Sequence, residues 1–388
     1  MTATPRIVGD DAGLRELVAE ARHAPRLAVD LEASGMFAYR ARVCTMQLAW
    51  DGGRSIVVVD ALAAPIAPLA RLLGEHGPTK IVHDVAFDAR LLAESHIALG
   101  NVHDTSVAAR MLGRAATGLA SLLKSELGLC IGKTLQRHDW RVRPLDPTVL
   151  TYLAEDVAHL EALESRLWTE VVERGIEDAV LEETSYRIAS AIAAVNAPAP
   201  PPPYVRVKGA SALAERDLAA LRVVAWLRER EAQLRDVPPH KVAPNEALIA
   251  IARTRPASSA QLARVRGIST SSPAARAFVA EMASAIATAG DRLPDEERAY
   301  FEAPRVPAAV GRARRKREAL VIAWRRAEAK LRGVDEQVVL PGHCVKDAVD
   351  ADVTDVEALS RVPGIGEFRL RRDGNAIVGV LRGDGARE

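Results

Sequence analysis

The feature that most constrains this chain is a short apolar run ending in two carboxylates, Leu27-Ala28-Val29-Asp30-Leu31-Glu32, followed by Ala33-Ser34-Gly35. The run predicts a β-strand, in which alternate residues point to the same face. Asp30 and Glu32 would therefore stand side by side and repel each other. A strand with one solvated polar face would show the same pattern, but a carboxylate pair also suits a hard cation such as Mg²⁺, which prefers oxygen ligands.

The elements that follow predict a mixed sheet covered by helices. Strand-like runs over 43–50 and 55–60 flank Asp51-Gly52-Gly53, which is a hairpin signal, so the first three strands should form an antiparallel meander. Beyond residue 60, strands alternate with helices, which indicates parallel pairing through crossovers. We expect a five-stranded sheet with the Asp30 strand in the middle, strands over 80–83 and 101–103, and helices over 61–73, 85–94, 118–127 and 147–172.

Further acidic residues lie at the starts of the expected helices or within them. Asp88 lies near the start of an expected helix, and Asp104 precedes the next helix as a typical N-cap. Tyr152 and Asp156 are four residues apart in another expected helix, so they share one face. Each is unremarkable alone, since acidic residues commonly serve helix starts and tyrosines commonly pack in cores. Together with the strand pair they indicate a common site.

This order resembles the DEDD superfamily of 3′→5′ exonucleases, in the subgroup with tyrosine before the last aspartate, and within it the ribonuclease D family. The resemblance covers residues 25–175 and rests on these segments: Asp30-Leu31-Glu32, His83–Asp88, His103-Asp104-Thr105, Asp139-Trp140, Arg143-Pro144-Leu145, Tyr152 and Asp156. The sequence departs from the family pattern at Asp84, where a small or amide residue is usual, and at His159, where an aromatic residue is common.

The resemblance implies a ribonuclease H-like α/β exonuclease domain and two divalent metal ions, Mg²⁺ or Mn²⁺. The implied metal ligands are Asp30, Glu32, Asp88 and Asp156. Asp30 would bridge both ions, Glu32 and Asp156 would complete the site of the nucleophilic water, and Asp88 would support the second ion. Tyr152 would orient that water. The candidate substrate-binding residues are His83, Phe87, Trp140 and Arg143.

The second half of the chain is predicted to be helical and internally repeated. Residues 197–203 read Ala-Pro-Ala-Pro-Pro-Pro-Pro, a stiff linker. Beyond it, helical segments around Trp226 and Trp324 are each followed by a proline segment and a glycine-containing turn. Both units resemble the HRDC module of ribonuclease D and RecQ-type helicases. The expected domains are an exonuclease domain (1–185), a Pro-rich linker (186–207), a first HRDC domain (208–292) and an HRDC-like domain (305–388), and we expect the part before the linker to fold alone.

The charge is divided unevenly between the two halves. Residues 1–186 hold 19 Lys and Arg against 26 Asp and Glu, whereas residues 187–388 hold 33 against 25. An acidic metal-binding unit joined to a basic one suits a polyanionic substrate. The local basic run Arg312-Ala313-Arg314-Arg315-Lys316-Arg317 could meet phosphates or could be a solvated linker.

Composition limits the compartment and the class of protein. The three cysteines, Cys44, Cys130 and Cys344, are far apart, which disfavours a disulfide framework or a zinc site and fits a reducing cytosol. The sequence shows neither a signal peptide pattern nor an apolar run long enough to span a membrane, so we expect a cytoplasmic protein without membrane contact.

These observations predict a metal-dependent 3′→5′ exoribonuclease that trims RNA with a free 3′ end, with tRNA precursors as the expected substrate and 5′-mononucleotides as products. A DNA 3′→5′ exonuclease and a non-catalytic RNA-binding protein are the alternatives, although the presence of all four acids and Tyr152 argues against the latter. A RecQ-like helicase is excluded despite the shared accessory module, because no G-x-x-x-x-G-K-[ST] segment occurs.

Overall fold

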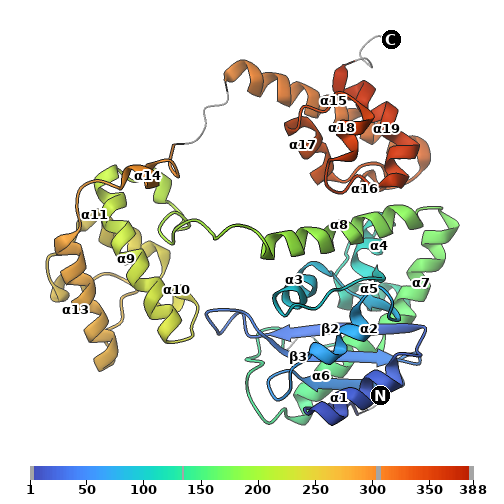
Figure 1. Cartoon of the computed structure of the whole chain (residues 1–388), viewed down its shortest axis with the longest axis horizontal. Helices are drawn as coiled ribbons and strands as arrows, with labels where there is room; N and C mark the ends of the chain where they lie inside the picture. Colours follow the sequence, from blue (N-terminus) through green and yellow to red (C-terminus); the bar gives the residue numbers. More distant parts are fainter. Residues whose placement is uncertain (1–3, 133–134, 303–306, 384–388) are drawn as a thin grey trace. The chain divides into compact units, whose positions relative to one another are not determined.

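The computed structural model describes residues 4–132, 135–302 and 307–383. These residues form two compact units, whose secondary-structure elements are labelled in Figure 1. The first unit comprises residues 4–33, 43–196 and 307–383, and the second comprises residues 34–42 and 197–302.

The first unit is built around a mixed sheet of six strands in the order β1-β4-β3-β2-β5-β6. Strands β2, β3 and β4 form the predicted antiparallel meander, and β1 and β6 pair in parallel at the two edges. Strand β2, which carries Asp30 and Glu32, lies inside the sheet as expected. The strands are β1 (Arg6–Val8), β2 (Arg26–Ala33), β3 (Val43–Trp50), β4 (Ser55–Asp60), β5 (Thr79–Val82) and β6 (Val102–Asp104).

The prediction of five strands is wrong by one, because the edge strand β1 was not foreseen. It is three residues long, and only Val8 of the three is buried, so it offers no alternation of apolar and polar residues. Its place in the sheet comes from parallel pairing with β4, beginning at Arg6 opposite Val57. A strand of this kind is specified by its neighbour rather than by its own sequence.

The turn between β3 and β4 confirms the hairpin signal and helps to place a helix of the site. Asp51, Gly52 and Gly53 have φ values of 58°, 68° and 80°. A Cβ on Gly53 would lie 2.0 Å from the carbonyl oxygen of Ala158, at the end of helix α6 (Pro147–Ala158). Glycine at this position therefore lets the hairpin approach the helix backbone closely.

The helices that precede the linker differ from the prediction in detail. Within residues 61–73, the helical part begins only at Ala67, where a short 3₁₀ turn leads into α2. The residues before this turn, which include Pro65, are not helical. Residues 147–172 form two helices that meet at His159 instead of one. The remaining helices are α1 (Asp11–Ala21), α2 (Ala70–Leu73), α3 (Ala86–Glu94), α4 (Thr105–Met111), α5 (Leu119–Leu127), α7 (Leu160–Glu173) and α8 (Glu177–Val195).

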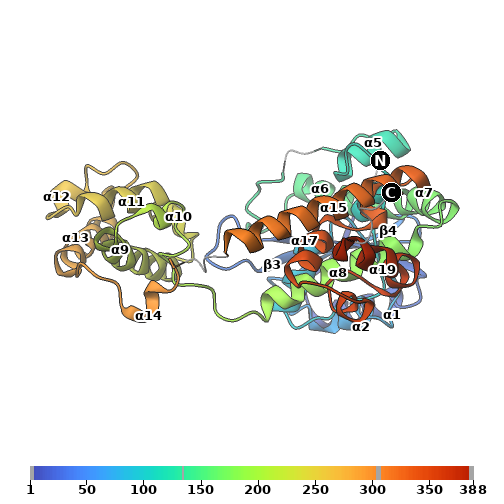
Figure 2. The same ribbon diagram turned by 90° about the horizontal axis from the view of Figure 1, so that it is seen from above.

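The C-terminal helices pack against α8 within the same unit, and Figure 2 shows α17 and α19 over that helix. Arg369 is fully buried, and its Nη1 donates to Glu182 Oε2 at 2.7 Å, while the Phe368 N–H donates to Glu182 Oε1 at 2.7 Å. The His343 ring stacks on Tyr186 at 3.8 Å. These helices are α15 (Ala308–Arg332), α16 (Glu336–Val339), α17 (Gly342–Asp350), α18 (Val356–Ser360) and α19 (Glu367–Arg382).

This packing differs from the expectation that residues before the linker fold alone. Val338 of α16 belongs to the same apolar cluster as residues of α4, α7 and α8, and Phe368 packs against that cluster. Removing the C-terminal helices would expose these side chains and leave Glu182 without Arg369. The unit that contains the sheet is therefore completed by the C-terminal helices α15–α19.

We expect Gly366→Ala to loosen this packing. A Cβ at residue 366 would lie 2.3 Å from Glu182 Oε1, so the carboxylate would have to leave the start of α19 and the buried Arg369. Losing such a bond to a charged group costs about 1–3 kcal/mol. The thermal midpoint should fall, and proteolysis between the domains should become faster. Gly379→Ala in the same helix is the control, because nothing lies within 4 Å of its Cβ, and alanine should stabilise α19 by about 1 kcal/mol.

The second unit is a helical domain around one apolar core, with Leu221, Leu248 and Met282 fully buried. It also holds the loop 34–42, where the Tyr39 hydroxyl donates to Glu229 Oε1 at 2.7 Å. Residues 186–195, expected as part of the linker, belong to α8, so the non-helical segment begins at Asn196. The helices are α9 (Glu215–Leu234), α10 (Pro239–Val242), α11 (Asn245–Thr254), α12 (Ser259–Leu262), α13 (Pro273–Thr288) and α14 (Asp295–Arg298).

Within the described residues, every helix is too short or too polar to cross a bilayer.

Candidate active site

Strand β2 delivers the first two acids to one face of the sheet. Asp30 pairs with Gln47 and Glu32 with Thr45 of β3, and the register shifts directly after Glu32. Ala28 points to the same face, and it packs against Ala154 and Val157 of α6. Because side chains alternate along β2, Ala28, Asp30 and Glu32 share one face. The apolar part of that face packs against α6, and the two carboxylates project next to the helix.

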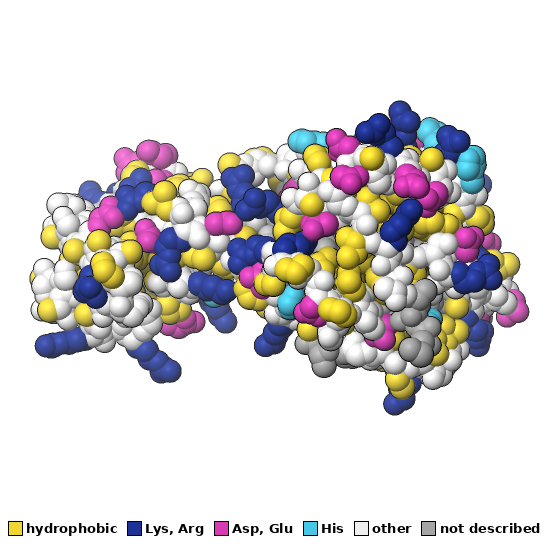
Figure 3. All heavy atoms as spheres, turned by 90° about the horizontal axis from the view of Figure 1, so that it is seen from below, with side chains coloured by type: hydrophobic (Ala, Val, Ile, Leu, Met, Phe, Trp, Pro, Cys, Tyr) yellow, Lys and Arg dark blue, Asp and Glu magenta, His cyan; other side chains and the backbone are white. Residues whose placement is uncertain are grey.

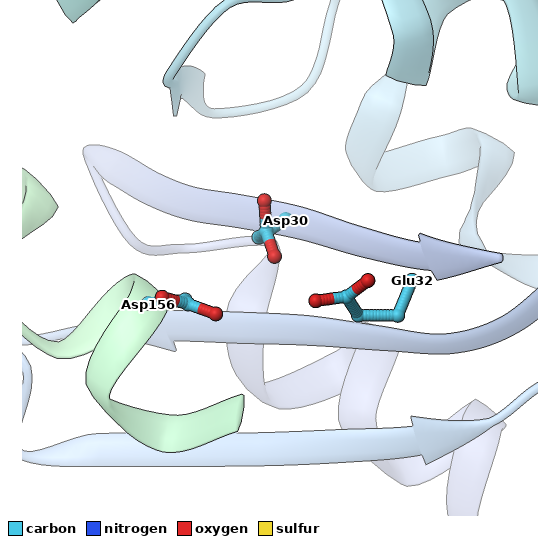
Figure 4. A group of neighbouring side chains, drawn as sticks. All are labelled: Asp30, Glu32 and Asp156. Atoms are coloured by element: carbon cyan, nitrogen blue, oxygen red, sulfur yellow. The ribbon is translucent and has the colours of Figure 1, made fainter. Parts of the chain in front are cut away.

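Helix α6 supplies the third acid. Asp146 caps the helix by accepting from the backbone N–H groups of Thr148 and Val149. Asp156, in the last turn of the helix, projects toward Asp30 and Glu32 (Figure 4). The three carboxylates each offer an oxygen within 4.8 Å of the others. Asp30, Glu32 and Asp156, which we expected to belong to a common site, thus form one cluster.

Asp88 lies in the first turn of α3 and is buried, with a relative exposure of 6%. It is outside the three-carboxylate group, but it is close enough to Asp30 and Glu32 for their charges to raise its pKa. The fully buried Asp104 holds the turn before α3, because its carboxylate accepts from the N–H groups of Asp84 and Val85 at 3.1 and 2.9 Å. Asp104 also caps α4, as predicted.

Burial raises the pKa values of all four acids, and repulsion from neighbouring carboxylates adds to the shifts of Glu32, Asp88 and Asp156. Burial is the largest cause throughout, and it raises the pKa of Asp30 to about 7. Burial and the charges of Asp30 and Asp156 raise the pKa of Glu32 to about 9. The pKa of Asp156 rises to about 8, partly through Asp30, and that of Asp88 lies well above its ordinary value. Carboxylates held this way are stabilised by a bound cation.

Tyr152 lies one turn before Asp156 on α6, and its hydroxyl hydrogen-bonds the Asp156 carboxylate. Burial and the neighbouring negative charges raise the pKa of Tyr152 well above 10. The phenol therefore stays protonated and can act as a hydrogen-bond donor at the site, while it cannot serve as a base near neutral pH.

The raised pKa values predict that the metal-free protein loses stability as pH rises. Asp30, Glu32 and Asp156 bind protons more tightly when folded than when unfolded, so the folded state holds more protons between about pH 4 and 9. The free energy of unfolding should therefore fall as pH rises from about 4 to about 9. Each kcal/mol lost lowers the thermal midpoint by about 2–4 °C, so we expect a fall of about 4 °C or more from pH 6 to pH 9 in EDTA.

Added Mg²⁺ should remove this pH dependence, because a cation would replace the protons. Thermal melts at both pH values, with EDTA and with Mg²⁺, measure the effect. A melting profile in EDTA that stays flat or rises over this range would contradict the expectation.

The four candidate substrate-binding residues fall into two groups. His83 and Phe87 flank the start of α3: His83 Nδ1 lies 2.9 Å from Thr105 Oγ1, and the Phe87 ring is 52% exposed beside Asp88. Trp140 is instead buried, at 3% exposure, with its ring 5.8 Å from that of Tyr152. Phe87 is therefore free to meet a ligand, whereas Trp140 packs behind the tyrosine.

Arg143 is engaged within the protein. Its Nε and Nη2 donate to the two carboxylate oxygens of Asp60 at 2.6 and 2.8 Å, and Nη2 also donates to the carbonyl of Cys44 at 3.0 Å. This places Arg143 as an anchor that joins the loop before α6 to strands β3 and β4.

Two residues of the site were missed or only partly understood from the sequence. Gln47 lies opposite Asp30, and its signal was an amide inside the run 43–50, in which Thr45 is the other polar residue. Asp104 was read as an N-cap, but it also fixes the turn that presents Asp88. That second role depends on backbone groups 19 and 20 residues earlier, which no local pattern shows.

Comparison with known proteins identifies the families to which two segments of the chain are similar. The 3′-5′ exonuclease family matches residues 5–172, and the HRDC domain family matches residues 217–286. A ribonuclease D of Gluconacetobacter diazotrophicus is 32% identical over 275 residues, covering 68% of this chain and 67% of that protein. A ribonuclease D of Acidiphilium cryptum is 30% identical over 293 residues, covering 74% and 73%.

Solved structures share the fold. The crystal structure of Escherichia coli RNase D, described as an exoribonuclease involved in structured RNA processing, has a TM-score of 0.69 at 21% identity and covers 98% of this chain and 99% of that one. A protein from Bifidobacterium adolescentis has a TM-score of 0.75 at 21% identity, covering 98% and 97%.

The sheet, the carboxylate cluster and the family match define a 3′→5′ exonuclease domain joined to an HRDC domain. Such exonuclease domains use divalent metals, and the cluster offers the oxygen ligands that these ions prefer. The chain belongs to the ribonuclease D family, and it is a 3′→5′ exoribonuclease.

Proposed function

We propose that the enzyme removes nucleotides from RNA 3′ ends with two divalent ions and releases 5′-mononucleotides. The convergence of Asp30, Glu32 and Asp156 within 4.8 Å, with Asp88 close by, is the observation that supports this most strongly. When bound, two such ions lower the pKa of a water molecule and neutralise charge that develops on the phosphate and the leaving oxygen.

Each of the four acids and Tyr152 would have a separate role in the reaction. Asp30 would be shared by both ions, Glu32 and Asp156 would hold the one beside the attacking water, and Asp88 would support the other. Tyr152 would orient the water through its hydroxyl, which stays protonated because its pKa is raised above 10. Its bond to Asp156 fixes the direction of that hydroxyl.

The terminal nucleotide would lie against the start of α3. The exposed Phe87 ring follows the turn at Asp84 and precedes Asp88, so a base stacked on it would bring its phosphate toward the acids. His83, which follows the end of β5, would contact the same nucleotide. Trp140 and Arg143 would act indirectly, by packing against Tyr152 and by anchoring the loop before α6.

We further propose that the exonuclease domain comprises residues 1–185 and the remainder of α8, that residues 208–292 form a first HRDC domain, and that residues 305–388 form a second, HRDC-like domain. The third helix of each helical domain follows a proline, Pro244 or Pro341. A glycine with φ near +90° packs on the start of that helix in both: Gly267 against Pro244, and Gly364 against His343. The proline pair and the glycine pair are each separated by 97 residues, which supports a duplicated module.

The proposed substrate is a structured RNA with a 3′ extension, specifically a tRNA precursor. The test uses a 5′-labelled tRNA precursor with a short 3′ trailer and a DNA of matched trailer sequence, with Mg²⁺, Mn²⁺ or EDTA. We expect stepwise shortening of the RNA with either metal, release of 5′-mononucleotides, and no reaction in EDTA. Equal rates on both polymers would favour a DNA exonuclease, and activity in EDTA would contradict the metal site.

The basic run at the start of α15 is a candidate for the phosphate contacts. Arg314 and Arg317 pair with Asp350 and Asp352, whereas Arg312, Arg315 and Lys316 are exposed and make no ion pair with any described residue. On the face drawn in Figure 3, Lys and Arg side chains are interspersed with Asp and Glu. The test is therefore directed at this local cluster rather than at the overall charge.

Changing Arg312, Arg315 and Lys316 to Gln should weaken RNA binding and flatten its salt dependence. Each lost phosphate contact reduces the slope of log K against log salt by about 0.7, so the slope should fall by about 2. The control changes three exposed arginines of the exonuclease part, Arg15, Arg22 and Arg54, to Gln. Matching slopes for the two variants and the wild type would show that the run is a solvated linker.

A further inference from the structure

Strand β3 carries two fully buried polar side chains directly opposite the paired acids. All eight residues of β3 are buried, and Thr45 and Gln47 both have 0% exposure. A buried amide without partners costs about 1–3 kcal/mol, so Gln47 must be bonded on both its oxygen and its nitrogen. An apolar residue at position 47 would need no hydrogen-bond partners.

The register brings these polar residues to the acids. Gln47 pairs with Asp30 and Thr45 pairs with Glu32 across the antiparallel ladder. Side chains of residues paired in this way lie on the same face of a sheet, next to each other. Thr45 and Gln47 therefore lie beside the paired acids, on the face of the sheet that α6 covers.

One orientation of the Gln47 amide satisfies both of its ends. Its Oε1 then accepts from Thr45 Oγ1 at 2.8 Å, and its Nε2 donates to the Asp30 carbonyl oxygen at 2.8 Å and to Asp30 Oδ2 at 3.3 Å. The chain of bonds runs from the Thr45 hydroxyl through the amide to the carboxylate of Asp30. The Asp30 side chain is thus held at one of its two oxygens by a rigid, buried donor.

We propose that Gln47 is a positioning residue for Asp30, an inference that rests on the metal-dependent function proposed above. The amide fixes the direction of the Asp30 carboxylate, which would hold the metal ions, and it does so without adding charge to a site that already holds four acids. Glutamate at this position would add a fifth carboxylate, and leucine would leave Asp30 free to rotate. Thr45 in turn fixes the amide, because its hydroxyl can donate only if Oε1 faces it.

Gln47→Leu is the main test. Losing a partner that orients a metal ligand costs about 10–100-fold in metal affinity or activity. We expect kcat to fall by that factor, the Mn²⁺ concentration for half-maximal rate to rise, and KM for RNA to stay within about threefold, since Gln47 is buried away from RNA. Direct Mn²⁺ binding, followed by electron paramagnetic resonance without RNA, should weaken in parallel.

Three further variants separate positioning from packing. Thr45→Val removes only the hydroxyl that orients the amide, so it should give a smaller loss in the same direction, even if Gln47→Leu folds poorly. Gln47→Glu should lose more activity than Gln47→Leu. Met46→Leu changes the same strand on its other face and conserves volume, so kcat and Mn²⁺ binding should stay unchanged.

The inference is overturned if Gln47→Leu and Thr45→Val bind Mn²⁺ and turn over like the wild type. It is also overturned if their losses equal that of Met46→Leu and follow the thermal midpoint alone. The Asp30→Asn variant distinguishes failure of the proposed role of Gln47 from failure of the proposed metal site. If Asp30→Asn is inactive while Gln47→Leu is normal, only the role of Gln47 fails, whereas an active Asp30→Asn enzyme would remove the metal site itself.

Discussion

Asp30→Asn is expected to lower the exonuclease rate by about 10³-fold or more while the fold and RNA binding remain nearly intact. Asparagine keeps the volume of the side chain, but it removes a negative charge from the centre of the carboxylate cluster. Metal ions contribute several kcal/mol of transition-state stabilisation, and about 4 kcal/mol corresponds to a factor of 10³. Single-turnover degradation of a labelled RNA at saturating Mg²⁺ measures the loss.

Asp84→Asn is the matched control for this variant. It removes one carboxylate charge near the same helix, but the Asp84 side chain is 61% exposed and faces Arg187 at 3.5 Å. Asparagine also tolerates the φ of 66° found there. We expect its rate to stay within a few-fold of the wild type. An Asp30→Asn enzyme with comparable activity would rule out the assigned metal site.

The same variant should stabilise the metal-free protein. Removing the Asp30 charge relieves repulsion on Glu32, Asp88 and Asp156, whose pKa values are raised partly by it. The thermal midpoint in EDTA at pH 8.5 should therefore rise. A gain in stability together with a loss of activity would show that the cluster is strained in order to bind its cations, which misfolding cannot produce.

Local periodicity explains why most of the site could be predicted from the sequence. Asp30 and Glu32 share a face because a strand repeats every two residues, and Tyr152 and Asp156 share a face because a helix repeats every 3.6. The Asp51-Gly52-Gly53 turn and the Asp104 cap are also set by residues within four positions of each other. Their roles as catalytic groups remain proposals that the variants above test.

The parts that could not be predicted depend on distant residues. The bond from Arg369 to Glu182 joins positions 187 residues apart, and neither residue stands out in its own helix. The partner of Gln47 is fixed by strand register, and β1 is fixed by pairing with β4. These three contacts are determined by tertiary packing, which local sequence patterns do not specify.

Tyr152→Phe is expected to slow turnover by about 10²-fold, since misorienting a reacting group costs about that factor. The change removes only the hydroxyl that bonds Asp156, and the ring can keep its packing against Trp140. Metal affinity should change little, because the four acids stay in place. The pH dependence of the residual rate should also keep its shape, since a phenol with a pKa above 10 does not titrate in the working range.

Thr151→Val provides the comparison, since it deletes a hydroxyl from the adjacent residue of α6, where it bonds the Pro147 carbonyl within the helix. Its rate should stay within about twofold of the wild type, because that bond contributes only about 1 kcal/mol to the helix and none to the site. Rate and Mn²⁺ binding are measured on both variants. An unchanged rate for Tyr152→Phe would reduce Tyr152 to a packing residue. A loss of Mn²⁺ affinity would instead show that its bond to Asp156 holds a metal ligand rather than a water.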